Sequence, residues 1–185
     1  TGWTYAGAPS FALAFPTIAN QIVPMQAYPE QHDTGAKRVL SYTGAAFTQI
    51  PAGQTPQQDL DDALDNIFRH PNVAPFISKQ LIQRLVISNP SPQYVERVAR
   101  VFEHDGAGRR GELDAVVKAI LLDPEARNAP ADANAGKLGE PVLRLTRVWR
   151  AYGATSPSGK LNVQNIPGFI GQGPLQAPSV FNFFS

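Results

Sequence analysis

The chain has 185 residues, of which 17% are charged, and its formal net charge is +1. This length suits one domain, and the near-zero charge supplies no overall field that would attract nucleic acid, so we expect no nucleic-acid partner. There is no cysteine, which excludes disulfides, zinc–thiolate sites and thiol nucleophiles. No apolar run approaches the roughly 18 residues of a membrane span.

Residues 1–54 are predicted to form an irregular, partly β segment. Prolines interrupt this segment repeatedly, it has no charged side chain before Glu30, and no helical period lasts within it. Two short strands are predicted over 37–42 and 46–50, because β-branched and aromatic residues alternate there on either side of Thr43 and Gly44.

At Thr55 the pattern changes to helix. Thr55 is suited to cap the first helix, with Pro56 at the first helical position and Gln58 completing a capping box. Four more helices are predicted between prolines, glycines and capping residues. The five expected ranges are 55–70, 72–87, 91–105, 111–122 and 140–152, with a short extra turn opened by Asp123 and Pro124.

Each predicted helix carries apolar residues three or four positions apart, which is typical of a helix with one buried face. In the first helix this face consists of Leu60, Ala63, Leu64, Ile67 and Phe68. In the last helix it consists of Val142, Leu145, Val148, Trp149 and Tyr152. We therefore expect a mainly α fold, a bundle of about five helices over 55–153.

Residues 154–185 are rich in Gly, Pro, Ser and Asn but keep large apolar side chains such as Phe169 and Phe181. Because disordered segments usually lack such aromatics, we expect an ordered tail that wraps the helices. The first residue is not Met and the last lie within an aromatic run. The chain is thus predicted to be a single domain or a fragment of a larger one.

The most reactive group in the sequence is His32, Asp33 and, four residues on, Lys37. The first two could act as base and acid, with the lysine stabilising an anion, so the three are candidate catalytic residues. Adjacent residues of an extended chain point in opposite directions, however, and would need a turn to converge. The favoured alternative is structural: Asp33 forms an Asx turn, and His32 packs on a neighbour.

Arg144, Arg147 and Arg150 follow one another three residues apart on the last predicted helix. Such a stripe could bind a phosphate, sulfate or carboxylate, which makes Arg144 and Arg147 candidate ligand-binding residues, although a solvated helix face is the favoured interpretation. The other histidines, His70 and His104, do not form an HxH or HExxH spacing with His32. No metal site and no cofactor are predicted.

Several motifs in a fixed order resemble one known family. They read FRHPNVAPFI at 68–77, LIQRLV at 81–86, NPSP at 89–92, AILLDPEAR at 119–127, KLGEP at 137–141 and APSVFNFFS at 177–185. Together with Thr1-Gly2-Trp3 and the His32 group, they resemble the bacterial family called domain of unknown function 1800. The resemblance covers essentially the whole chain and places it in the C-terminal half of longer proteins.

The resemblance implies a bacterial protein that is often exported, which suggests a periplasmic or extracellular location. It also implies two partners, the N-terminal half of the same polypeptide and a sulfatase-related protein encoded nearby. No activity is assigned to the family, so two functions stay open. One is a structural or protein-interaction module; the other is the C-terminal part of an enzyme, for example a hydrolase, whose active site is completed elsewhere.

Overall fold

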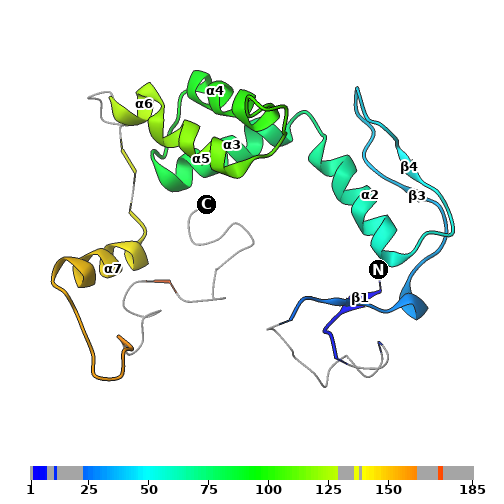
Figure 1. The fold of residues 1–185 in the computed structure, drawn as a ribbon, viewed down its shortest axis with the longest axis horizontal. Coiled ribbons are helices and arrows are strands. Elements are labelled where there is room, and N and C mark those ends of the chain that lie inside the picture. Colours follow the sequence, from blue (N-terminus) through cyan, green and yellow to red (C-terminus); the bar gives the residue numbers. More distant parts are fainter. Residues whose placement is uncertain are drawn as a thin grey trace.

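A computed structural model describes residues 2–7, 11, 23–128, 136–137, 139–161 and 171–172 of the chain. The described elements are mainly helices, with a few two-residue strands near the N-terminus, so the predicted fold class is confirmed. Helices α3, α4 and α5 lie together, α2 leads from them towards the strands, and α7 lies apart from both (Figure 1). The structure is therefore a small helical core with two arms.

The N-terminal segment contains two short antiparallel ribbons. Strand β1 (Trp3–Thr4) pairs with β2 (Gln26–Ala27), and β3 (Lys37–Arg38) pairs with β4 (Gln49–Ile50). A 3-10 helix, η1 (Pro29–Gln31), connects them. The predicted hairpin is confirmed, but its strands have two residues each instead of five or six. They end early because the backbone of Leu40 bonds to the side chain of Asn66 and not to the opposite strand.

The six described helices begin and end close to the predicted positions. They are α2 (Pro56–Phe68), α3 (Val73–Leu85), α4 (Pro92–Glu103), α5 (Leu113–Leu122), α6 (Pro124–Arg127) and α7 (Pro141–Ala151). The capping box is confirmed, since the amide of Gln58 donates to the Thr55 side chain and the amide of Thr55 donates to Gln58 Oε1. The extra turn after Asp123 is α6.

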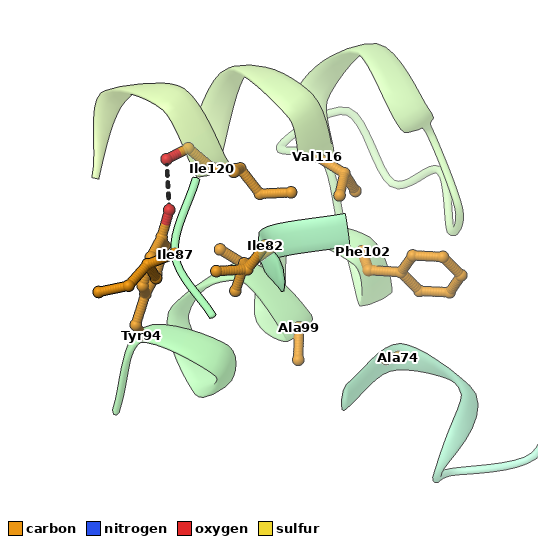
Figure 2. Close-up of a cluster of buried hydrophobic side chains, with 9 residues drawn as sticks. Ala74, Ile82, Ile87, Tyr94, Ala99, Phe102, Val116 and Ile120 are labelled. Carbon is orange, nitrogen blue, oxygen red and sulfur yellow. Dashed lines mark hydrogen bonds between the residues drawn. The ribbon is translucent and has the colours of Figure 1, made fainter. Parts of the chain in front are cut away.

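The core lies between α3, α4 and α5 (Figure 2). Its fully buried side chains come from all three helices, among them Ile82, Val98, Val116 and Ile120. The Tyr94 hydroxyl, on α4, donates to the Ile120 carbonyl oxygen at 2.6 Å. That carbonyl belongs to the last turn of α5, where no further helical amide is available to pair with it. Tyr94 therefore fills the core and also completes the end of a helix.

A cluster of charged side chains attaches α6 to α4 next to this core. The Arg97 guanidinium forms two parallel bonds to the Asp123 carboxylate, at 2.7 and 2.8 Å. This contact with Arg97 lowers the pKa of Asp123, although partial burial opposes the shift. Glu125, in turn, accepts bonds from the amide and hydroxyl of Ser91, the residue that caps α4. The start of α4 and the start of α6 are thereby held together.

Two of the apolar faces predicted to be buried are exposed in the described residues. On α2 the buried residues are Pro56, Asp59 and Asn66, whereas Leu64 is 54% exposed. On α7 no residue is buried, and Tyr152, which follows it, is 86% exposed. The expected wrapping tail lies mostly outside the described residues, at 162–170 and 173–185. Its described residue Gln172 accepts a bond from the amide of Val142 at 3.0 Å.

The substitution Tyr94→Phe tests the hydroxyl in the core. Burial, followed by the charges of Asp123 and Glu125, raises the pKa of Tyr94 to about 12, so the hydroxyl stays a proton donor at neutral pH. Without it a buried carbonyl loses its partner, and we expect the free energy of unfolding to fall by about 1–2 kcal/mol in urea denaturation. Tyr152→Phe, at an exposed position, is the matched control and should change nothing. Equal stability of the two variants would contradict this role.

Candidate functional site

His32 and Lys37 converge on a carboxylate of α2, and the three side chains form what we call the Asp59 cluster (His32, Lys37 and Asp59). His32 Nε2 lies 2.8 Å from Asp59 Oδ2, and Lys37 Nζ lies 2.7 Å from the same oxygen. The side chains of His32 and Asp59 are only 6% and 8% exposed. The cluster therefore joins the N-terminal segment to the first turn of α2 through a nearly dry polar contact.

Local chain geometry places each member. Helix η1 ends at Gln31, and the amide of His32 closes it by donating to the Pro29 carbonyl at 3.1 Å. Gly2 has a φ of +71°, and a Cβ there would lie 2.9 Å from the Tyr28 carbonyl oxygen, so β1 rests directly on η1. Only glycine fits this close approach with a positive φ. Strand β3 then begins with Lys37, beside the start of α2.

The electrostatics of the Asp59 cluster favour an ionised carboxylate. The contact with Lys37 is the largest cause that lowers the pKa of Asp59, burial opposes it, and His32 contributes further lowering. Asp59 also stands in the first turn of α2, where the helix dipole favours a negative charge. The side chains of Lys37 and His32 and the start of α2 therefore both favour the ionised form of Asp59.

Asp33 does not join the cluster. Its Oδ1 accepts the amide of Gly35 at 2.8 Å, which is an Asx turn. The Lys37 ammonium donates to the carbonyl oxygens of Asp33 and of Gly35, the latter at 2.9 Å, in addition to its contact with Asp59. An ammonium has three hydrogens, so all of them have an acceptor within reach. The turn thus positions Lys37. Asp33 contributes its backbone carbonyl to this contact, and its carboxylate is used within the turn.

The chemistry open to the cluster follows from which atoms are accessible. Both ring nitrogens of His32 are buried, and neither forms a hydrogen bond of good geometry within the described part of the chain, although Nε2 lies 2.8 Å from Asp59 Oδ2. A histidine that acts as a base needs one nitrogen directed at its substrate. The described geometry of the Asp59 cluster is that of a closed joint between two chain segments.

Asn66 forms a second joint, two helical turns after Asp59 on the same face of α2. Its amide nitrogen donates to the carbonyl oxygens of Leu40 and Phe47 at 3.1 and 3.0 Å, and its oxygen accepts the amide of Leu40 at 3.1 Å. The side chain is 2% exposed overall. The hydroxyl of Tyr42 adds a bond to the Asn66 backbone carbonyl at 2.7 Å. The loop of the β3–β4 hairpin is thereby fixed to the last turn of α2.

Arg110 forms a third joint, at the C-terminal end of α2. Its guanidinium donates to the carbonyl oxygen of Phe68 at 3.1 and 3.2 Å and to that of His70 at 3.3 Å. The Phe68 carbonyl ends α2 and has no helical amide to pair with, whereas the His70 carbonyl, beyond the helix, also accepts the amide of Val73. The same guanidinium lies over the rings of Phe68 and Phe102, 5.5 and 5.3 Å from their centroids. Arg110 therefore attaches α2 to the helical core.

With α2 held in this way, its apolar side opens onto a groove of about 650 Å³. We call it the α2 groove; α2, α3, Phe102 and the start of α5 line it. Apolar side chains at its walls are strongly exposed, including Ile67 at 49%, Phe76 at 54% and Leu113 at 55%. The full lining consists of Leu64, Asp65, Ile67, Phe68, Val73, Phe76, Ile77, Phe102, Gly111 and Leu113.

The remaining candidates from the sequence lie elsewhere. The ring of His70 packs on Tyr42, with centroids 4.7 Å apart, and its Nδ1 accepts the amide of Asn72. His104 Nδ1 accepts the amide of Gly106 in a turn. Arg144 and Arg147 are exposed on α7, at the opposite end of the molecule from the Asp59 cluster (Figure 1). The structure does not bring the arginines and the His32 group together.

Within the described residues, no group of three or more His, Cys, Asp and Glu side chains is placed to hold a metal ion. None of the described helices has the length and apolar character needed to cross a membrane.

Comparison with known proteins agrees with the motifs. The family model described as "Protein of unknown function (DUF1800)" matches residues 1–185. The chain belongs to this family, which confirms the resemblance found in the sequence. No curated protein and no solved structure matches the chain significantly. The function must therefore be argued from the residues themselves.

The substitution Asp59→Asn tests the Asp59 cluster. At neutral pH we expect a lower free energy of unfolding, because an amide does not neutralise the partly buried ammonium of Lys37. The pKa of Asp59 is lowered by folding, so its stabilising effect is complete above the unfolded pKa of about 4 and is lost as the pH falls through the lower folded pKa. The gap between wild type and variant should thus close in acid.

Urea denaturation between pH 7 and pH 2.5 measures this gap. Asp61→Asn, at an exposed position of the same helix, is the control and should leave the stability nearly unchanged at every pH. If the free energies of unfolding of wild type and Asp59→Asn are equal at pH 7, or if their difference grows in acid, the Asp59 cluster does not stabilise the fold in this way.

Proposed function

We propose that the chain is a protein-interaction module and that the α2 groove is its binding surface. The observation that carries this proposal is the exposed apolar side of α2, which continues across α3 to the start of α5. Contiguous apolar surface of this kind is uncommon on a finished monomer and is typical of contact sites. Its walls are aromatic and aliphatic side chains, the residue types that contribute most at the centres of interfaces.

The shape and chemistry of the groove favour an apolar or amphipathic helix as its occupant. Its walls are two helices, α2 and α3, and a helix laid between them would pack side chains into an open furrow. Asp65 is the one charged residue among its lining residues, so recognition would depend on apolar burial more than on ion pairs. The partner we propose is the N-terminal half of the same polypeptide, in an exported bacterial protein. The sulfatase-related protein is a second candidate partner.

The joints described above suit such a module, because a rigid groove loses little entropy when it binds. The Asp59 cluster and Asn66 hold α2 from the N-terminal side, and Arg110 holds it from the core side. The first two joints use buried or partly buried polar contacts, which specify one arrangement more strictly than apolar contacts do. The groove is therefore expected to keep its shape without its partner.

The second candidate is an enzyme part, for example of a hydrolase, in which His32, Asp33 and Lys37 contribute to the site. The observation in its favour is the short separation between His32 and Asp59, the arrangement by which a carboxylate orients a catalytic imidazole. We rank it second because Lys37 already has its acceptors and His32 is closed to solvent. A hydrolytic activity of the longer polypeptide that survives His32→Gln unchanged would exclude it.

The substitution Leu113→Glu tests the α2 groove. A carboxylate at this wall should repel an apolar occupant, while its position in the first turn of α5 makes it compatible with folding. We expect the fluorescence of bound anilinonaphthalene sulfonate to fall severalfold in the 185-residue chain. Leu40→Glu, at an exposed leucine outside the groove, should leave it unchanged.

The same dye separates this proposal from its alternatives in the longer polypeptide. There the proposed helix fills the groove, so wild-type protein should bind little dye, and Leu113→Glu should lower thermal stability because it weakens docking. If Leu113→Glu does not change dye binding by the 185-residue chain, the α2 groove is not the binding surface. A longer polypeptide that exposes the groove as much as the short chain does would count against the proposed partner.

A further inference from the structure

Helix α7 has an apolar side and a basic side, although one exposed leucine, Leu143, lies among the arginines. At 100° per residue, Val142, Leu145, Val148, Trp149 and Tyr152 fall within an arc of about 120°. Arg144, Arg147 and Arg150 occupy an arc of similar width on the opposite side. An apolar side with Trp and Tyr opposite a side of arginines is the pattern of helices that lie in a membrane interface.

The apolar side of α7 is not covered within the described residues. None of the residues of the helix is buried, Val148 is 48% exposed and Tyr152 is 86% exposed. Its start is nevertheless fixed in place: Glu140 pairs with Arg84 at the end of α3, with 3.7 Å between Nη1 and Oε1. The amide of Val142 also donates to Gln172 Oε1. The helix is therefore tethered at its beginning, and its remaining length is uncovered by the part of the chain that the structure describes.

The charge of the chain is also uneven, with an excess of basic residues in the part that contains α7. From residue 141 to residue 185 there are three arginines and one lysine but no aspartate or glutamate. Residues 1–140 carry 12 basic and 15 acidic side chains, so the small net charge hides a basic end and an acidic remainder. Within the described part of the chain, none of the three arginines of α7 forms a salt bridge. The basic charge of α7 is thus available to an external anion.

We propose that α7 is a peripheral anchor that binds anionic lipid surfaces. Its axis lies in the plane of the interface, the apolar side enters the boundary between headgroups and acyl chains, and the arginines reach back to the lipid phosphates. Trp149 and Tyr152 suit this depth, because an aromatic ring with a polar group is partly apolar and partly wet. The acidic remainder of the chain is repelled by the same surface and faces away from it.

A competing occupant for α7 is the α2 groove of a second copy. Docked there, the apolar side would be buried, but the three arginines would point into solvent and make no use of their charge. A lipid surface engages both sides of the helix at once, and for that reason the observations favour it. The proposal is independent of the function that we propose for the α2 groove.

Sedimentation with phospholipid vesicles tests the anchor. We expect the 185-residue chain to bind vesicles of 30% phosphatidylglycerol in phosphatidylcholine and not vesicles of phosphatidylcholine alone. Binding should fall steeply between 0.1 and 0.5 M salt. Replacing Arg144, Arg147 and Arg150 by Gln should reduce it by roughly fivefold for each arginine. The variant with Val148→Ser and Tyr152→Ser keeps its charge and should also bind weakly.

A control of equal charge separates the anchor from general attraction. Arg38→Gln, Arg69→Gln and Arg100→Gln remove three exposed arginines outside α7 and should leave binding intact. In a Trp3→Phe background, Trp149 is the remaining tryptophan, and its emission should shift to the blue with anionic vesicles. Circular dichroism checks that every variant is folded.

Three results would overturn the proposal. The first is the absence of binding to anionic vesicles, and the second is an equal loss of binding in the two arginine variants. The third is the formation of dimers through α7, as measured by sedimentation velocity, together with no binding to lipid vesicles.

Discussion

The way in which α2 packs against the N-terminal segment depends on the polar face of this helix. Asp59 and Asn66 lie two turns apart on the same side of the helix, and both are buried against the N-terminal segment. A buried polar group that loses its partner costs about 1–3 kcal/mol, so turning α2 about its axis would break several contacts at once. The helix is therefore held with its polar side inwards. Its apolar side must then face away from the segment that it supports.

This orientation separates the structural from the interactive surfaces of the chain. The Asp59 cluster and the Asn66 contacts are buried or partly buried, and the Arg110 contacts lie nearer the surface. Together they connect the N-terminal segment, α2 and the helical core in sequence. Within the described residues, nothing covers the α2 groove or the two sides of α7. The residues that looked most reactive serve as joints in this geometry, whereas ordinary leucines, phenylalanines and arginines form the surfaces available to partners.

Local signals explain how far prediction could go. Prolines, caps and apolar spacing act within a few residues, which is why the helices and the hairpin were predicted near their observed positions. Periodicity identifies an apolar stripe but not whether the chain itself covers it, so the exposed side of α2 was missed. Asp59 lies among other acidic residues, so the local sequence suggests a solvent-exposed side chain. Its partners lie 27 and 22 positions earlier, and no local pattern connects them; the same holds for Arg110 and Phe68.

The most direct test of this account is the reactivity of single cysteines, which the cysteine-free chain makes possible. Leu64→Cys places a thiol on the apolar side of α2, and Ser78→Cys places one in the core, where the serine is fully buried. In the folded 185-residue chain we expect a thiol reagent to modify the first at nearly the rate of the denatured protein and the second at least a hundredfold more slowly. Protection of position 64 comparable to that of position 78 would show that the apolar side of α2 is covered, and would contradict the account.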